Sequence, residues 1–146
     1  MTIDKTQIRN ASTVIVLRDR MTNPRILMGQ RGANAAFMPN KVVFPGGAVD
    51  VGDADIPLAT PLPDLCRARL SQDSAADLAD PLAIAAIREL FEETGQVLGH
   101  PSPWADDIPN DWTGFAATGH RPSAAGLQFV FRALTPPGRT RRFDAR

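Results

Sequence analysis

The chain has 146 residues, of which 43% are hydrophobic and 22% charged, a composition typical of one soluble globular domain. Its formal net charge is zero, which argues against a dedicated surface for nucleic acid or for an anionic membrane. No apolar run has the length of a membrane span, and residues 1–5 lack a signal-peptide pattern. The single cysteine, Cys66, is expected to be a packing residue in a cytoplasmic protein.

The first half of the chain predicts a series of short strands. Residues 11–18 are rich in β-branched side chains, and residues 25–31 follow a turn at 21–24, so we expect a hairpin. A further strand over 41–44 runs into Pro45-Gly46-Gly47. We expect a sharp turn there, because glycine permits close approach of the backbone.

Residues 54–80 combine a proline-punctuated stretch with a short predicted helix around 65–70. Long segments of this kind in compact domains tend to be functional or mobile, so we interpret this one as a cap over the functional site. An inert surface excursion is the alternative. Later in the chain we expect a short helix within 109–118 and a strand over 127–134.

A longer helix is predicted over residues 81–94. Asp80 is a suitable N-cap, Pro81 fits the first helical position, and Gly95 is a natural C-terminal stop. Its apolar side chains recur at helical spacing and should pack against the sheet; they are Leu82, Ala83, Ala86, Ile87 and Leu90.

The last turns of this helix carry three carboxylates, Glu89, Glu92 and Glu93, which share one face because they stand three or four residues apart. Their mutual repulsion and the helix dipole would destabilise a bare helix, and Arg88 is the one basic residue nearby. A divalent cation would offset this charge, since clustered oxygen ligands suit Mg²⁺ or Mn²⁺. A merely solvated acidic face is the alternative.

Together with the preceding glycines, this segment resembles the box of the Nudix hydrolases, which reads G-x5-E-x7-R-E-U-x-E-E-x-G-U with U an apolar residue. Gly47 matches the first glycine, and Asp53 stands where the first glutamate is expected. The second half of the box is matched by Arg88, Glu89, Leu90, Glu92, Glu93 and Gly95. Gln96 departs from the final apolar position.

The spacing of the box is the largest departure. Between Asp53 and Arg88 lie 34 residues where the pattern has seven, so 27 extra residues split it. Such an insertion is tolerable if it loops out, because the entropy of loop closure grows only logarithmically with length. A split box after a run like Phe37 to Gly47 is similar to one branch of the family, which includes the peroxisomal coenzyme A diphosphatases.

The resemblance implies an α/β protein with the Nudix fold, in which a mixed β-sheet lies between helices. We expect a single Nudix domain over residues 1–146, with the insertion at about 54–80 inside the box. The sequence predicts about four strands and no late amphipathic helix. We therefore expect the fold to be incomplete at the C-terminus, so that either the chain is truncated or a second copy completes the sheet as a homodimer.

The resemblance also implies a metal-dependent hydrolase that cleaves the pyrophosphate bond of a nucleoside diphosphate linked to another moiety. The catalytic set would be Arg88, Glu89, Glu92 and Glu93, with any one glutamate as the general base. Mg²⁺ or Mn²⁺ would be held by Glu89, Glu92, Glu93 and the Gly46 carbonyl, and would activate a water molecule. Gly47, Asp53 and Gly95 would be structural positions of the box, with Arg88 orienting the loop through Asp53 or a glutamate.

The resemblance implies a nucleotide-containing small molecule as the substrate and leaves several such compounds as candidates. Coenzyme A and its thioesters lead, but their upstream signature is only loosely matched: residues 27–31 fit its start, and Ala36 replaces an expected arginine. ADP-ribose-like and dinucleotide substrates are alternatives. Arg31 is the candidate for phosphate binding, with a solvated side chain as the alternative. The basic tail, Arg139, Arg141, Arg142 and Arg146, is expected to be a disordered, solvated terminus; binding of a 3′-phosphate or RNA is the alternative.

Another class of function competes with the enzyme: a Nudix-like module that binds a nucleotide, or regulates a partner, without turnover. The split box and Asp53 favour this interpretation. The complete set of Arg88 and three glutamates opposes it, because a pure binding module has no need of a destabilising charge cluster. We favour the enzyme for a full-length protein; a third interpretation is that these 146 residues fold but are inactive.

Overall fold

The structure is a computed structural model that describes residues 7–36, 38–105 and 107–146. Phe37 of the quoted run and the expectation about residues 1–5 lie outside this part of the chain. Within it, no helix is long and apolar enough to cross a membrane.

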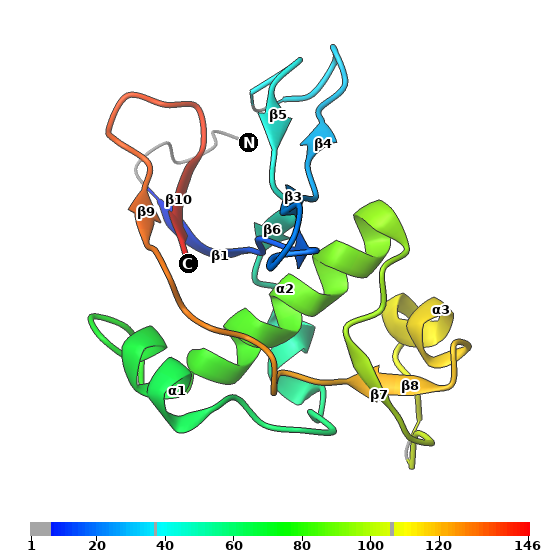
Figure 1. The fold of residues 1–146 in the computed structure, drawn as a ribbon. Coiled ribbons are helices and arrows are strands. Elements are labelled where there is room, and N and C mark those ends of the chain that lie inside the picture. Colours follow the sequence, from blue (N-terminus) through cyan, green and yellow to red (C-terminus); the bar gives the residue numbers. More distant parts are fainter. Residues whose placement is uncertain (1–6, 37, 106) are drawn as a thin grey trace.

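A four-stranded mixed sheet and one long helix form the centre of the molecule (Figure 1). The central strand β1 (Ile8–Thr13) runs parallel to β10 (Arg142–Ala145) and antiparallel to β6 (Gly46–Ala48). β9 (Ala133–Leu134) pairs with β10 at the edge, which gives the order β6-β1-β10-β9. This combination of a mixed sheet with helices confirms the predicted α/β class.

Two hairpin-like pairs replace the longer strands that the sequence predicts in the first half. β2 (Leu17–Arg18) pairs with β3 (Arg25–Ile26), which confirms the hairpin, and β4 (Gly29–Gln30) pairs with β5 (Val42–Val43). The chain thus changes partners about halfway along each predicted strand. Of the sharp turn predicted at 45–47 only a bend at Pro45 is present, because Gly46 and Gly47 lie within strand β6.

A further antiparallel pair, β7 (Gly99–Pro101) and β8 (His120–Pro122), follows the long helix and has no counterpart in the sequence predictions. Between the two strands lie η2 (Asn110–Trp112) and α3 (Thr113–Ala116), which confirm the short helix expected within 109–118. Trp112 and Phe115 from these turns are buried, so the segment is anchored by aromatic side chains.

The long helix α2 (Ala79–Thr94) begins two residues before the predicted start. Leu78 is its N-cap, so the prediction that Asp80 caps the helix is wrong. Pro81 is tolerated inside the first turn because the first amide groups of a helix have no carbonyl partner there, and Asp80 suits the positive end of the helix dipole. Gly95 ends the helix in the left-handed region, with φ of 72°, as predicted.

The insertion packs against the N-terminal half of α2. Its helix α1 (Asp64–Leu70) lies where the sequence predicts a short helix, and η1 (Val51–Asp55) precedes it. Side chains of the two helices form one buried cluster with Leu62, which precedes α1; the helix residues in it are Cys66, Leu70, Ala79, Leu82 and Ala83. Cys66 therefore packs in the core, as expected.

The middle of α2, from Ile84 to Leu90, packs on both sides of the molecule. Ala86 and Leu90 contact Val14, next to β1, while Ile84 and Ile87 pack with the aromatic side chains of η2 and α3. Figure 1 shows the resulting arrangement, with α2 across the centre, α1 on one side and α3 on the other. The helix end that carries the glutamates is thereby fixed against the sheet.

The end of the chain contradicts the expectation of a disordered, solvated tail. Strand β10 occupies the middle of the sheet, and Asp144 in it accepts hydrogen bonds from Arg132 Nε and Nη2, both of 2.7 Å. Arg146 is buried, with its Nη1 3.3 Å from Asp144 Oδ2. Of the strand predicted over 127–134, only β9 joins the sheet. The local pattern missed β10 because its stability comes from β1, far away in the sequence.

We predict that Asp144→Asn lowers the free energy of unfolding by about 1–3 kcal/mol at neutral pH, because the buried Arg146 loses its anionic partner. The hydrogen bonds from Arg132 outweigh desolvation and lower the pKa of Asp144. Its contribution is therefore present above the unfolded pKa of about 3.9 and is lost as the pH falls through the lower folded pKa. Urea unfolding at several pH values measures both effects.

Asp73→Asn is the matched control for this prediction. The Asp73 carboxylate lies 3.8 Å from Arg132 Nη1 but is 89% exposed, so its loss should change stability little. Equal destabilisation by the two variants would contradict the assigned role of Asp144.

Candidate functional site

Arg88 is buried where η1, β6 and α2 meet, and it binds all three. Its Nε and Nη2 donate to Asp53 Oδ1 and Oδ2 at 2.9 and 3.0 Å, and Nη2 also donates to the Ala48 carbonyl at 3.0 Å. Asp53 is 2% exposed. The predicted pairing of Asp53 with Arg88 is confirmed: the η1 turn brings the shorter carboxylate within reach.

The charges around Arg88 outweigh the effect of its burial. Desolvation alone would lower the pKa of Arg88, but the hydrogen bond and charge of Asp53, followed by those of Glu89, hold that pKa above its usual value. Arg88 therefore stays fully ionised. A buried guanidinium of this kind needs anionic partners, because an uncompensated buried charge is strongly destabilising.

The three glutamates of the box are the only glutamates in the chain, and two of them share Arg88. Glu89 Oε1 accepts a hydrogen bond from Arg88 Nη1 at 2.9 Å, and Glu92 Oε2 accepts one from the same nitrogen at 3.5 Å. Glu93 Oε2 instead accepts from the amide of Gly46 at 3.2 Å. The carboxylates are thus divided between the guanidinium and the backbone of β6.

The two glycines of β6 are required by close approach. A β-carbon at Gly47 would overlap the Glu89 carboxylate, and one at Gly46 would overlap the backbone at Ser12 and Thr13. The absence of side chains at Gly46 and Gly47 therefore lets the glutamate-bearing end of α2 and strand β1 come close to β6.

Desolvation acts on the two glutamates that lie farthest along the helix. It raises the pKa of Glu92 above its ordinary value, although Arg88 opposes this effect. It likewise raises the pKa of Glu93, against the hydrogen bond from Gly46. Both carboxylates are already partly desolvated. They therefore lose less hydration than solvated carboxylates would when they bind a proton or a cation.

The donor chemistry of the glutamates fits Mg²⁺ or Mn²⁺, because three carboxylates close together on a rigid helix supply hard oxygen ligands. Among the described residues, however, no group of three His, Cys, Asp or Glu side chains converges as a metal cluster. The glutamates are held by Arg88 and by the Gly46 amide, so binding a cation would require them to exchange these partners.

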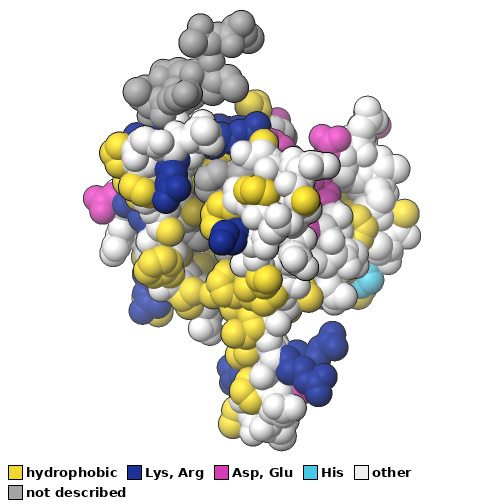
Figure 2. Space-filling view, turned by 90° about the horizontal axis from the view of Figure 1, so that it is seen from above, with side chains coloured by type: hydrophobic (Ala, Val, Ile, Leu, Met, Phe, Trp, Pro, Cys, Tyr) yellow, Lys and Arg dark blue, Asp and Glu magenta, His cyan; other side chains and the backbone are white. Residues whose placement is uncertain are grey.

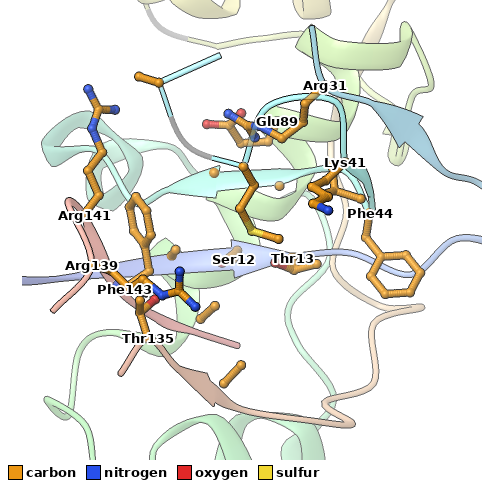
Figure 3. A pocket seen from close by; sticks show the side chains of 18 of the residues that line it. Ser12, Thr13, Arg31, Lys41, Phe44, Glu89, Thr135, Arg139, Arg141 and Phe143 are labelled. Carbon is orange, nitrogen blue, oxygen red and sulfur yellow. Dashed lines mark hydrogen bonds between the residues drawn. The ribbon is translucent and has the colours of Figure 1, made fainter. Parts of the chain in front are cut away.

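A cleft of about 1170 Å³ lies over the sheet next to these glutamates. Glu89 and Glu93 line it, and Arg31 and Lys41 extend into it from the β4–β5 region (Figure 3). The expected phosphate-binding residue Arg31 thus stands beside two of the predicted catalytic residues. Its Nε is buried without a hydrogen-bond partner among the described residues.

Comparisons with known proteins find a similar sequence and a similar structure. No family model matches the chain. It is 34% identical over 147 residues to nudix hydrolase 7 of Caenorhabditis elegans, covering 92% of this chain but 41% of that protein, so the chain spans about two fifths of the length of this curated relative. It also superimposes on a crystal structure of a Nudix hydrolase from Alicyclobacillus acidocaldarius with a TM-score of 0.68 and 28% identity, over 95% of this chain and 67% of that one.

The chain has a Nudix fold. The two likenesses also support the Nudix hydrolase family for this chain. Within that fold the box is assembled in space despite its split sequence, because Asp53 and Arg88 meet across the insertion. Gly95 ends α2, and the lack of a side chain at Gly47 makes room for the Glu89 carboxylate.

The insertion of this Nudix fold does not cap the cleft. Residues 54–80 are all described, and none of them lines it. They pack instead on the far half of α2, so the expected cap is wrong and the alternative of a surface excursion is favoured. The physical reason is the apolar face of α1, which Cys66 and Leu70 bury against the core.

Of the basic residues of the cleft, Lys41 was missed, and Arg139 and Arg141 were named only in the basic tail, with phosphate or RNA binding as the alternative to a solvated terminus. Figure 2 shows Lys and Arg side chains lying among hydrophobic ones on the face seen from above. The signal for Arg141 was the alternation of Arg141, Phe143 and Ala145, which places these three residues on one side of a strand. This alternation is informative only when the C-terminal residues are known to form strand β10.

We predict that Asp53→Asn destabilises the protein by about 3 kcal/mol or more, because it removes the bidentate charged partner of a buried guanidinium. Chemical unfolding measures this change. Asp50→Asn is the matched control: the Asp50 carboxylate lies 3.5 Å from the same guanidinium but is 61% exposed, so we expect a change within about 1 kcal/mol. Similar losses in both variants would refute the special role of Asp53.

Proposed function

We propose that the chain is a Nudix-type hydrolase that cleaves the pyrophosphate bond of a nucleoside diphosphate linked to another moiety. One observation carries this proposal: Glu89 and Glu93 border a cleft whose remaining described charged lining residues are all basic. Basic walls attract a polyphosphate, and the glutamates stand where its bond could be attacked. The likeness to Nudix hydrolases supports the same reaction.

The roles of the residues follow from their contacts. Glu89, Glu92, Glu93 and the Gly46 carbonyl are proposed to hold Mg²⁺ or Mn²⁺, which when bound would polarise phosphate oxygens and lower the pKa of a water molecule. Any one of these three glutamates is proposed to act as the general base in place of its role as a ligand. Arg88 is proposed to orient Glu89 and Glu92, with which it already shares hydrogen bonds.

Arg88 is suited to release the glutamates without losing its own stabilisation. When Glu89 and Glu92 turn to another cation, the guanidinium keeps both hydrogen bonds to Asp53 and the one to the Ala48 carbonyl. The buried positive charge therefore remains compensated. Arg31, on the wall next to Glu93, is proposed to bind a phosphate of the substrate as a bidentate donor.

Coenzyme A and its thioesters are our first candidates for the substrate, followed by ADP-ribose-like compounds and dinucleotides. The basic cleft suits all of them. The buried, unpaired Cys66 favours a reducing compartment such as the cytoplasm. Val130 and Phe131, each 71% exposed beside the edge strand β9, favour the expected association with a second copy.

A second function, nucleotide binding without turnover, is favoured by the present contacts of the glutamates. Arg88 and the Gly46 amide occupy these carboxylates, and no metal cluster forms among the described residues. A binding module would keep these contacts when a nucleotide enters the cleft. The two functions differ in whether a divalent cation binds and whether turnover depends on it.

We predict that Mg²⁺ or Mn²⁺ supports hydrolysis of at least one of coenzyme A, acetyl-coenzyme A, ADP-ribose and NADH. Glu92→Gln and Glu93→Gln should each lower kcat about 100-fold or more, because each removes a proposed ligand or base. Phosphate-product detection measures the rate, and titration calorimetry with Mn²⁺ measures metal binding. Asp77→Asn removes an exposed carboxylate outside the cleft and should change neither quantity.

The outcomes separate the two functions. Metal binding without turnover of any of the four compounds would favour the binding module. Absence of metal binding in the unsubstituted protein would refute the proposed metal site, and the acidic face of α2 would then be an ion-paired surface.

A further inference from the structure

The β2–β3 hairpin projects from the body of the molecule and has two chemically different faces. In the pairing of its strands Leu17 stands opposite Ile26, and Arg18 stands opposite Arg25. Because successive side chains of a strand point to opposite faces, the apolar pair lies on one face and the arginines lie on the other. Figure 2 shows the hairpin as an arm at the bottom of the view, where Lys or Arg side chains lie beside hydrophobic ones. The hairpin is therefore an amphipathic ribbon.

The face with the arginines continues into the core and attaches the hairpin to the body. Val16 and Leu27 stand on this face, and the Leu27 amide donates to the Val16 carbonyl at 3.0 Å. Both side chains pack against the buried cluster of Val14, Ala86 and Leu90. The opposite face of the ribbon, which we call the outer face, has no part in this attachment.

The outer face is apolar although it is open to solvent. Four side chains with exposed fractions between 41% and 51% form it; they are Ile15, Leu17, Ile26 and Met28. Met21, in the turn of the hairpin, is 84% exposed. Single exposed apolar side chains are ordinary, whereas adjoining ones mark an interaction surface. The outer face and the turn together have the character of such a surface.

The arginines of the hairpin are arranged unfavourably for the protein alone. Arg18 and Arg25 directly oppose each other, and like charges in this position destabilise a pair of strands. Neither side chain, nor that of Arg20 in the turn, has an ion pair or hydrogen bond within the described part of the chain. Asp19 is the one acidic residue of segment 15–28, so positive charge is in excess. An external anionic surface would relieve this repulsion.

We propose that the β2–β3 hairpin docks the protein on an anionic membrane surface. The outer face and Met21 would enter the boundary between lipid headgroups and acyl chains, while the guanidinium groups bind the phosphates around them. The zero net charge argues against such a surface for the molecule as a whole, but the hairpin is a local exception. Met28 also lines the cleft, so docking would bring the cleft beside the membrane.

A second copy of the chain fits this surface less well than a lipid bilayer does. A stable protein interface uses roughly 20–30 residues from each partner, many more than the hairpin presents. A two-fold contact between hairpins would also bring like charges together, because each copy contributes the same arginines. An anionic bilayer instead supplies an apolar layer for the outer face and phosphates for the arginines.

Co-sedimentation with vesicles tests this inference. Vesicles of equal parts phosphatidylcholine and phosphatidylglycerol should bind the protein at least about tenfold more strongly than pure phosphatidylcholine, because each arginine near an anionic surface favours binding. A rise in NaCl from about 0.05 M to about 0.5 M should weaken this binding, since salt screens exposed charges. Absence of binding, or equal binding to the two kinds of vesicle, would overturn the inference.

Two double variants test the two faces separately. Arg18→Gln/Arg25→Gln should weaken binding to the anionic vesicles about tenfold or more, because two cations are lost. Leu17→Ser/Ile26→Ser should weaken it to a similar degree, because less apolar surface leaves water. All four residues are exposed, and circular dichroism will verify that the variants are folded. Unchanged binding in either folded variant would contradict the docking role of the hairpin.

Matched controls remove the same kinds of side chain elsewhere. Arg9→Gln/Arg69→Gln removes two exposed arginines, and Val51→Ser/Leu65→Ser removes apolar side chains that are 94% and 63% exposed. Both controls should bind anionic vesicles as the unsubstituted protein does. A loss of binding equal to that of the hairpin variants would overturn the inference, because binding would then follow total charge or general hydrophobicity.

A fluorescent reporter gives a local measurement that does not depend on removing contacts. Met21→Trp places an indole at the turn, and its emission should shift to shorter wavelength when anionic vesicles are added. Leu65→Trp is the control and should show no shift. A shift in the control alone would place the membrane on another face. If sedimentation equilibrium shows that Leu17→Ser/Ile26→Ser turns a dimer into a monomer while vesicle binding persists, the outer face docks on a second copy and the inference is overturned.

Discussion

The buried ion pair between Arg88 and Asp53 is the interaction on which the rest of the site depends. It joins η1, where the insertion begins, to the helix that carries the glutamates, and its guanidinium also binds the carbonyl of Ala48 in β6. Burial makes the pair sensitive to the loss of either partner, because one charge would be left uncompensated. The insertion can consequently be long while the geometry at its two ends stays fixed.

This arrangement also fixes the positions of the glutamates. Arg88 holds Glu89 and Glu92 from within the helix, and the bare backbone of β6 receives Glu93 through the Gly46 amide. A side chain at Gly47 would displace the Glu89 carboxylate. Charge and shape therefore act together: the ion pair fixes α2 relative to η1, and the glycines allow its acidic end to lie on the sheet.

The sequence predicted the features that arise from local physics, and missed those that depend on distant partners. Helix α2 with its stop at Gly95 and the β2–β3 hairpin follow from spacing and turn chemistry, whereas the pairing of Asp53 with Arg88 was expected from the resemblance to the Nudix box. The start of α2 was placed too late because a helix accepts proline anywhere in its first turn. Strand β10 was missed because nothing near it reveals that β1 is its partner.

The same distinction explains why a neutral chain can present a basic cleft. Its C-terminal arginines look alike in sequence, and strand alternation sorts them only after β10 has paired with β1. Arg142 donates to the Thr135 carbonyl and Arg146 pairs with Asp144, so both become part of the fold, whereas Arg141 lines the cleft. Pairing of one strand thus converts an apparently solvated tail into structural cations and cleft-lining cations, and the latter give the cleft its charge.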